Sequence, residues 1–169
     1  LNNLAGTCAE YERYDMAREY YQKTIDMDPD YRVGLRNLAV LHGMLGDYQE
    51  GISAMLRVIE IDGDFYGPDS PIVADGLNDM AIMLYLSGKK EQAADAFKKA
   101  QTIDFAFYGA VHPAYARDTF NLGLALHAVG DQQEAQAYRQ QALEFFQQNF
   151  GPNHPHTQAA QKNHFIQSQ

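Results

Sequence analysis

A short sequence pattern occurs three times in this chain and limits what it can fold into. The copies span residues 66–71, 108–113 and 150–155, and each begins with an aromatic residue and a glycine and ends with a proline. The interval between successive copies is constant. Glycine adopts the left-handed conformation just past a helix end at low cost, and proline fits the first turn of a helix. The pattern therefore predicts a helix that ends before each glycine and a new helix that begins at each proline.

The segments between these copies carry apolar residues at helical spacing. Leu1, Leu4, Ala5 and Cys8, for example, occupy positions i, i+3, i+4 and i+7 and fall on one helix face. Asp28 and Pro29 predict a helix that begins at residue 29, because aspartate favours the N-cap and proline the first turn. We expect helices over about 1–11, 16–25, 29–45, 48–61, 71–87, 90–107, 113–129, 132–149 and 155–166.

Four positions of these segments repeat in register. The first position holds Leu4, Leu38, Met80 and Leu122, and the second holds Ala5, Ala39, Ala81 and Gly123. The third holds Ala17, Gly51, Ala93 and Ala135, and the fourth holds Thr24, Val58, Ala100 and Ala142. The period is 34 between the first two copies and 42 afterwards. Small residues at matched positions let antiparallel helices approach closely, so we expect stacked helical hairpins.

This pattern resembles the tetratricopeptide repeat family, whose basic unit is a helix–turn–helix of about 34 residues. The 42-residue spacing, the sequence Leu-Asn-Asn-Leu-Ala at 1–5 and the sequence Gly-Pro-Asn-His-Pro at 151–155 are similar to the kinesin-light-chain type of that family. The chain departs from the family pattern at Glu12, where a turn glycine is usual, at Gly51, where alanine is usual, and at Arg139, where an aromatic residue is usual.

The resemblance implies an all-α fold, a right-handed superhelical stack of antiparallel helical hairpins with about four repeats and a terminal helix. It predicts a single repeat domain over residues 1–169. The repeats are expected at about 1–30, 31–69, 70–111 and 112–153, and the terminal helix at 154–167.

Composition narrows the class of partner. Lysine and arginine total 13 against 22 aspartates and glutamates, and the net charge of −9 argues against nucleic-acid binding. No apolar run reaches the length of about 20 residues that a membrane helix needs. The single Cys8 cannot form an intramolecular disulfide, and its place on an apolar face predicts an inert buried thiol. We expect a cytoplasmic location, no membrane insertion, and a true N-terminus upstream of Leu1.

The sequence carries no motif for catalysis or metal binding. The Gly-Lys-Lys at 88–90 lacks the glycine-rich loop that cradles phosphate. His112 and His154 precede prolines at repeated positions, which predicts helix caps or linkers, and the histidines do not show the converging spacing of metal ligands. We therefore expect no enzyme activity, no cofactor and no metal.

In a stack of this type, the first helix of each hairpin lines the concave side. Helical periodicity gives as the candidate peptide-binding groove Val33, Arg36, Asn37, Val40, Met44, Asp75, Asn78, Ile82, Tyr85, Arg117, Phe120, Asn121, Leu124 and His127. Exposed apolar patches mark interaction sites, and repeat solenoids commonly bind on concave surfaces. The set predicts binding of a peptide or helical segment of a protein partner. The alternative is that the last two helices, or a neighbouring subunit, cover and bury this surface.

One position of the first helices carries an amide or, in one copy, a carboxylate. Its members are Asn3, Asn37, Asp79, Asn121 and Asn163. Such a side chain can bond the main chain of a ligand or a neighbouring repeat, and both interpretations stay open. Some members of the family hold a C-terminal carboxylate with lysine, asparagine and arginine, and those residues are absent at the corresponding positions here.

The sequence therefore favours a non-enzymatic interaction scaffold. Two alternatives stay open: the chain is the regulatory or sensing arm of a larger enzyme or signalling protein, or it is a self-association module that forms a homo-oligomer.

Overall fold

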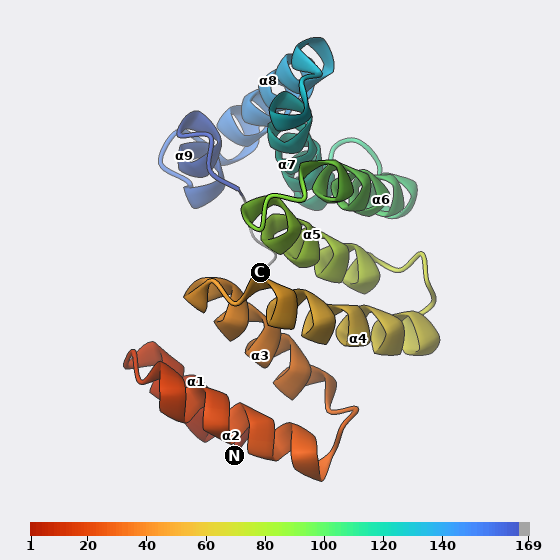
Figure 1. Cartoon of the computed structure of the whole chain (residues 1–169). Coiled ribbons are helices and arrows are strands. Elements are labelled where there is room, and N and C mark those ends of the chain that lie inside the picture. The colour runs from red at the N-terminus through yellow and green to blue at the C-terminus, as the bar shows by residue number, and fades with distance from the viewer. Residues whose placement is uncertain (166–169) are drawn as a thin grey trace. The chain divides into compact units, whose positions relative to one another are not determined.

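The computed structural model describes residues 1–165, which form nine α-helices and no strand (Figure 1). The helices are α1 (Asn2–Glu10), α2 (Tyr14–Met27), α3 (Arg32–Leu45), α4 (Tyr48–Tyr66), α5 (Pro71–Leu86), α6 (Lys90–Tyr108), α7 (Pro113–Val129), α8 (Gln132–Phe150) and α9 (Pro155–Gln161). Consecutive helices pack in pairs, α1 with α2, α3 with α4, α5 with α6 and α7 with α8, and α9 packs on α8. The predicted all-α fold of helical hairpins is confirmed.

The chain folds into two compact units. The N-terminal unit is Leu1–Pro68, and the C-terminal unit begins at Asp69. Within the N-terminal unit α2 also packs on α3, and within the C-terminal unit α6 also packs on α7. In each unit, then, the second helix of one hairpin contacts the first helix of the next. The single repeat domain with the boundaries given above stays a prediction.

The three aromatic-Gly…Pro stretches act as the sequence predicts. The helices α4, α6 and α8 end at Tyr66, Tyr108 and Phe150, and α5, α7 and α9 begin at Pro71, Pro113 and Pro155. The intervening glycines Gly67, Gly109 and Gly151 have φ angles of 94°, 78° and 79°. These angles lie in the region that favours glycine, so each stretch ends one helix and starts another through local backbone preferences.

A repeat with a period of 42 has eight more residues than one with a period of 34. These eight residues lengthen the helices on both sides of the connection between consecutive hairpins. The helix α2 has 14 residues, whereas α4, α6 and α8 have 19 each, so five of the extra residues extend the second helix. The other three extend the next first helix at its start. The five residues add about 7.5 Å to each long helix at 1.5 Å per residue.

Three predicted helix boundaries are wrong. The helix α4 was expected to end at residue 61 and ends at Tyr66. The helix α3 begins at Arg32 and not at Pro29, because the Asp28 carbonyl accepts a hydrogen bond from Tyr31 N–H at 3.1 Å and closes a turn. The terminal helix predicted over 154–167 ends at Gln161, since Asn163 adopts a left-handed φ of 57° and cannot continue it. Residues 166 and 167 of that prediction lie outside the described residues.

Small residues at the helix crossings form the centre of each hairpin. Ala5, Ala39 and Ala81 have no exposed surface, and neither do Ala17, Ala93 and Ala135. Cys8 is buried beside Ala5, as predicted. Among the described residues, no helix is long and apolar enough to cross a membrane.

The two histidines before prolines cap helices, as their repeated position predicts. His112 Nδ1 accepts a hydrogen bond from Ala114 N–H, and His154 Nδ1 accepts one from His156 N–H, both at 3.2 Å. The ring of Tyr108 stacks on the ring of His112, with centroids 3.8 Å apart. The aromatic residue that ends α6 therefore packs on the cap of α7 and fixes the connection between them.

Two glycines near the end of α4 test this account of the helix boundary. Gly67→Ala should destabilise the chain by about 1–3 kcal/mol, because its φ of 94° with ψ of 147° strains an L side chain. Gly63→Ala, inside the same helix and with only ordinary contacts at its Cβ, should stabilise it by about 0.5–1 kcal/mol. Urea unfolding of both variants measures the pair. Shifts in the same direction would contradict the assigned boundary.

Candidate functional site

The first helix of the second hairpin carries an exposed apolar strip. Val33, Val40 and Met44 of α3 are 42%, 41% and 65% exposed. Their spacing of seven and four residues places them within about 40° of one another around the helix. The opposite face of α3 carries Leu35 and Leu38, which are buried. We call Val33, Val40 and Met44 the α3 strip.

The remaining residues of the predicted groove differ widely in burial. His127 is exposed, and Arg36, Asn37, Asp75 and Tyr85 are half-buried. Asn78, Ile82, Arg117, Phe120, Asn121 and Leu124 are buried. All six buried residues are in the C-terminal unit. In that unit the predicted groove is therefore not open, and the alternative prediction, that other helices cover this surface, fits better.

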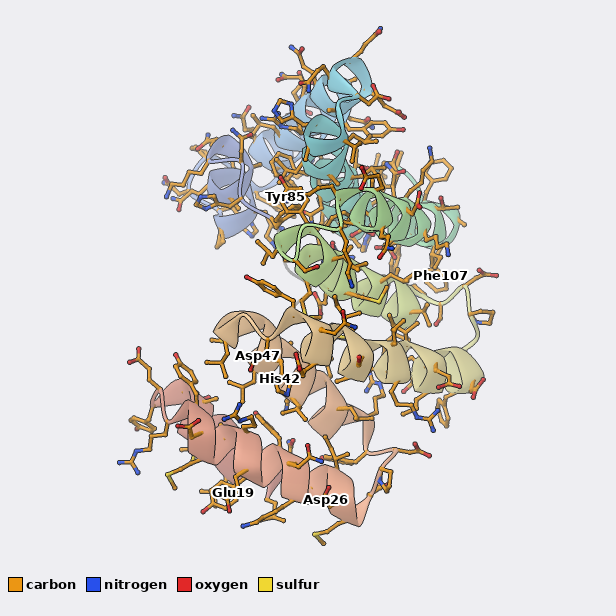
Figure 2. The ribbon with its side chains drawn as sticks, in the orientation of Figure 1. Glu19, Asp26, His42, Asp47, Tyr85 and Phe107 are labelled. Atoms are coloured by element: carbon orange, nitrogen blue, oxygen red, sulfur yellow. The ribbon has the colours of Figure 1, made fainter. Side chains whose placement is uncertain are left out.

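The predicted groove residue Tyr85 lies near the end of α5 (Figure 2). Two side chains cover its ring. The ring of Phe165 meets it edge to face, with centroids 4.7 Å apart, and Lys90 Nζ lies 3.3 Å from the centroid of the ring. Phe165 also stacks on Phe97 of α6, with centroids 5.6 Å apart. The segment that follows α9 therefore occupies the surface that Tyr85 was predicted to offer a ligand.

The predicted groove residues Phe120 and Leu124 belong to the core of the C-terminal unit. They pack with Phe146 of α8 and Ala160 of α9, and Phe120 is only 1% exposed. The helix α9 thus covers α7 in the way that the first helix of a further hairpin would. These buried residues therefore do not form an open groove on α7.

The repeated amides form hydrogen bonds between neighbouring hairpins. Asn37 Nδ2 donates to Asn2 Oδ1 at 3.3 Å within the N-terminal unit. Asn121 Nδ2 donates to Asn78 Oδ1 at 2.7 Å within the C-terminal unit, where both side chains are fully buried. Donor and acceptor hold the same relative repeat positions in both pairs. Of the two interpretations of this amide position, the contacts in the described structure support the bond between repeats.

Asn121→Ala tests the structural role of this bond. Removing one partner of a buried hydrogen bond costs about 1–3 kcal/mol, so urea unfolding should show a loss of this size. Asn37→Ala removes a longer bond at a half-buried site and should cost less. If Asn121→Ala leaves the free energy of unfolding unchanged, the amide does not hold α5 and α7 together.

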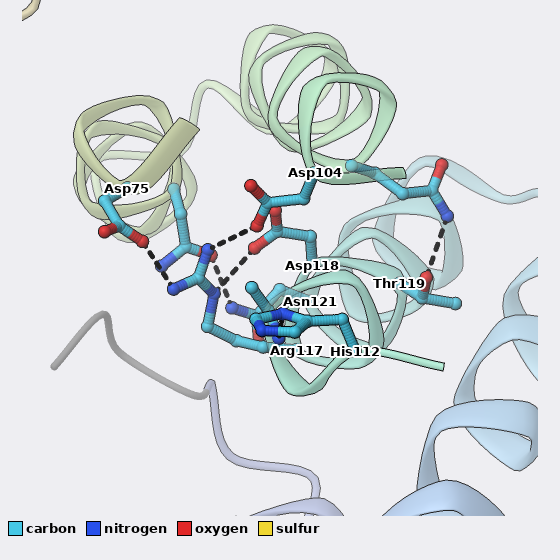
Figure 3. Close-up of polar contacts among 10 residues, drawn as sticks. Asp75, Asp104, His112, Arg117, Asp118, Thr119 and Asn121 are labelled. Atoms are coloured by element: carbon cyan, nitrogen blue, oxygen red, sulfur yellow. Dashed lines mark hydrogen bonds and ion pairs between the residues drawn. The ribbon is translucent and has the colours of Figure 1, made fainter. Parts of the chain in front are cut away.

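A buried arginine joins three helices of the C-terminal unit, α5, α6 and α7 (Figure 3). The Arg117 Nη1 donates to Asp75 Oδ1 at 2.7 Å, and its Nη2 lies 3.3 Å from Asp104 Oδ2. Its Nε donates to the adjacent Asp118 Oδ1 at 2.7 Å. Arg117, Asp104 and Asp118 have side chains no more than 7% exposed. The predicted groove residues Asp75 and Arg117 are thus brought together as an internal ion cluster.

Burial changes the protonation of this cluster. It raises the pKa of Asp118 from 3.8 to about 8, although Arg117 opposes the shift. It also raises the pKa of Asp104 to about 6, again against the effect of Arg117. A hydrogen bond between the two carboxyl groups raises the pKa of Asp118 and lowers that of Asp104. Near neutral pH, one proton is therefore held on Asp118.

The raised pKa values predict that stability falls as the pH rises. The unfolded chain loses these protons around the ordinary pKa of 3.8, whereas the folded chain keeps them until about pH 6 for Asp104 and about pH 8 for Asp118. The stabilisation is complete below about pH 4 and is lost progressively up to about pH 8. Thermal unfolding should give a Tm lower at pH 8 than at pH 6.5 by an amount on the order of 5 °C.

Asp118→Asn is the variant that checks this pH dependence. It removes the titrating group and should flatten the change in Tm between pH 6.5 and 8. His156 has a pKa lowered by burial and favours the folded state as the pH rises, but its effect is confined to pH values below about 6.5. A variant with the same slope as the parent chain would show that Asp118 is not the group responsible.

Sequence reasoning noted Arg139 as a departure but gave it no role, and it missed Asp104 and Asp118. The signal for Arg139 was present: the residues at the equivalent position of the other three hairpins are Tyr21, Met55 and Phe97. The signal for the two aspartates was weaker, because a carboxylate on a helix is usually solvated. Only the packing of α6 against α7 shows that both are buried.

Comparison with known protein families gives matches to the same kind of repeat in three segments of the chain. Tetratricopeptide repeat models match residues 1–31, 31–104 and 121–156. A comparison with curated protein sequences gave no match.

Solved structures of similar fold include two related to kinesin light chains. A putative kinesin light chain from Podosopora anserina with nearly identical TPR-like repeats is 18% identical, with a TM-score of 0.76 over 95% of this chain and 80% of that chain. BtubC (BKLC) from P. vanneervenii is 20% identical, with a TM-score of 0.78 over 99% of this chain and 65% of that chain. A mutant O-GlcNAc transferase from Thermobaculum terrenum is 20% identical, with a TM-score of 0.62 over 85% of this chain and 24% of that chain. These likenesses confirm the predicted helical-repeat fold.

Proposed function

Because the chain belongs to the tetratricopeptide repeat family, we propose that it is a non-catalytic scaffold that binds a peptide or helical segment of a partner protein on the α3 strip. Stacked helical repeats serve as protein-interaction scaffolds, since each hairpin presents its surface at a regular interval. The finer part of this proposal is the surface of the chain that binds the partner, the α3 strip.

The exposure of the α3 strip is the observation that carries the proposal. Val33, Val40 and Met44 are large enough to be buried, yet each is more than 40% exposed. The leucines at positions 35, 38 and 41 of the same helix are buried. The strip extends over about 16 Å along the helix axis at 1.5 Å per residue. That length suits about three turns of a helix or about five residues of an extended peptide.

The charge beside the strip suits an amphipathic partner. Arg36 lies between Val33 and Val40 in sequence and is half-buried at the edge of the strip. A partner segment with apolar residues at i, i+3 or i+4 and i+7 can cover the strip and keep its polar face in solvent. The equivalent positions in α5 and α7 include Ile82 and Leu124, which are buried, so those helices offer less apolar surface.

Selection of peptides from a displayed library against the intact chain tests this function. Recovered peptides are titrated by fluorescence anisotropy against the parent chain and against Val40→Glu, which places a carboxylate in the middle of the strip. We expect the variant to bind at least tenfold more weakly, which corresponds to about 1.4 kcal/mol.

Met27→Glu is the matched control for this substitution. Met27 is 78% exposed at the end of α2, so the change adds the same charge to the same unit away from the strip. Binding should be unchanged in this variant. Recovery of no peptide, or an equal loss of affinity in both variants, would contradict the proposed surface.

A second candidate function is that of an interaction arm attached to a catalytic domain. The likeness to the O-GlcNAc transferase favours it, because this chain covers only 24% of that chain. The complete reading frame that contains this sequence tests the candidate. A catalytic domain in the same frame would support it, and a frame without one would exclude it.

A further inference from the structure

Arg139 lies at a repeat position that is apolar and buried in the other three hairpins. The equivalent residues Tyr21, Met55 and Phe97 are no more than 4% exposed. In α8 the same position carries a guanidinium group and is half-buried. A cation at a core position costs free energy unless an anion or several acceptors compensate it. The substitution therefore indicates a local function that outweighs packing.

The helix opposite Arg139 is adapted to it. A Cβ atom on Gly123 would lie 2.7 Å from Arg139 Cγ and 3.0 Å from the carbonyl oxygen of Ala135, closer than side chains tolerate. The corresponding residues of the other hairpins are Ala5, Ala39 and Ala81. The glycine in α7 thus makes the space in which the stem of Arg139 crosses toward α9.

The guanidinium is only partly compensated within the described residues. Its Nη2 donates to Asn163 Oδ1, and its Nε is buried without a hydrogen-bond partner. No ion pair joins Arg139 to a carboxylate in the described part of the chain, whereas Arg18, Lys23 and Arg57 each pair with an acidic side chain.

Arg139 lines a pocket of about 380 Å³ at the junction of α7, α8 and the end of α9. Phe120, Leu143 and Ala160 supply apolar atoms to the pocket. Gln136, which is exposed, and Asn163 line it with amides that can bond a peptide main chain. The pocket thus combines one partly compensated cation, amide groups and an apolar wall.

We propose that this pocket binds the carboxylate of a glutamate or aspartate side chain in a partner peptide. A guanidinium offers a planar pair of N–H donors to a carboxylate, and such charge-assisted bonds are among the strongest hydrogen bonds in proteins. An apolar side chain next to the acidic residue packs on Leu143. The proposal rests on the proposed scaffold function, because the ligand is a peptide, but it concerns a surface of the C-terminal unit that is separate from the α3 strip.

The test compares two capped peptides that differ in one group. The probe is acetyl-Ala-Leu-Glu-Leu-Ala-amide, and its neutral control carries glutamine in place of glutamate. Both are titrated into the intact chain and followed by ¹⁵N NMR. The glutamate peptide should bind at least tenfold more tightly and should shift the resonances of Gln136, Asn163 and the Arg139 side chain. Equal affinity of the two peptides, or no binding of either, would overturn the proposal.

A third peptide and three variants identify the group that is recognised. The peptide acetyl-Ala-Leu-Leu with a free C-terminus should bind more weakly than the glutamate peptide; tighter binding would show that the site takes a chain terminus instead. Arg139→Gln should remove the preference for glutamate, and Lys162→Gln, which removes an exposed cation outside the pocket, should keep it. If Arg139→Gln does not fold, Gln136→Glu replaces it as the test of the pocket. The new carboxylate at this exposed position should repel the glutamate peptide and lower its affinity at least threefold.

A variant in the α3 strip distinguishes failure of the carboxylate pocket from failure of the proposed scaffold surface. Val40→Glu should leave the preference for glutamate unchanged, since the pocket belongs to the other unit. If library peptides lose binding in Val40→Glu but the glutamate and glutamine peptides bind equally, the scaffold function stands and the carboxylate pocket fails. If the glutamate preference is present but no library peptide depends on Val40, the pocket stands and the α3 strip fails.

Discussion

The arrangement of the C-terminal unit depends on the buried guanidinium of Arg117. It contacts Asp75 of α5, Asp104 of α6 and Asp118 of α7, and so connects the first helix of one hairpin, the second helix of that hairpin and the first helix of the next. Loss of one partner from a buried ion pair costs about 3–5 kcal/mol because the remaining charge has no compensation. Three carboxyl groups exceed one guanidinium in charge, and the proton held by Asp118 reduces this excess. The burial of the cluster and its protonation are therefore linked.

The same repeat position serves different purposes in the two units. Val33, Asp75 and Arg117 are separated by equal intervals along the chain and occupy equivalent places on their helices. In α3 this place is on the exposed strip, whereas in α5 and α7 it supplies an ion pair. The repeat fixes the direction in which each side chain points relative to its hairpin. What lies in that direction is decided by the neighbouring helix, and this differs between the units.

This distinction explains which features the sequence could predict. The ends of α6 and α8 follow from glycine and proline, whose preferences act over a few positions, and they were predicted to within one residue. The start of α3 was misjudged because Asp28 and Pro29 fit an N-cap and a first-turn proline, whereas they lie in a turn that the Asp28 carbonyl closes. The burial of Phe120 and Leu124 was not predictable from periodicity, because it depends on α9 and Phe165, which belong to a later part of the chain.

The Arg139 site shows how a departure from a repeat can be interpreted. An arginine in place of a core aromatic residue, taken alone, removes apolar packing that is worth about 3–5 kcal/mol in a well-packed core. A glycine in place of the crossing alanine, taken alone, weakens a helix by about 1 kcal/mol. The two departures face each other across α7 and α8, and the glycine supplies the space that the arginine stem fills. Because the glycine provides the space that the arginine stem fills, the two departures constitute one local adaptation, and its product is a half-buried cation that lines a pocket.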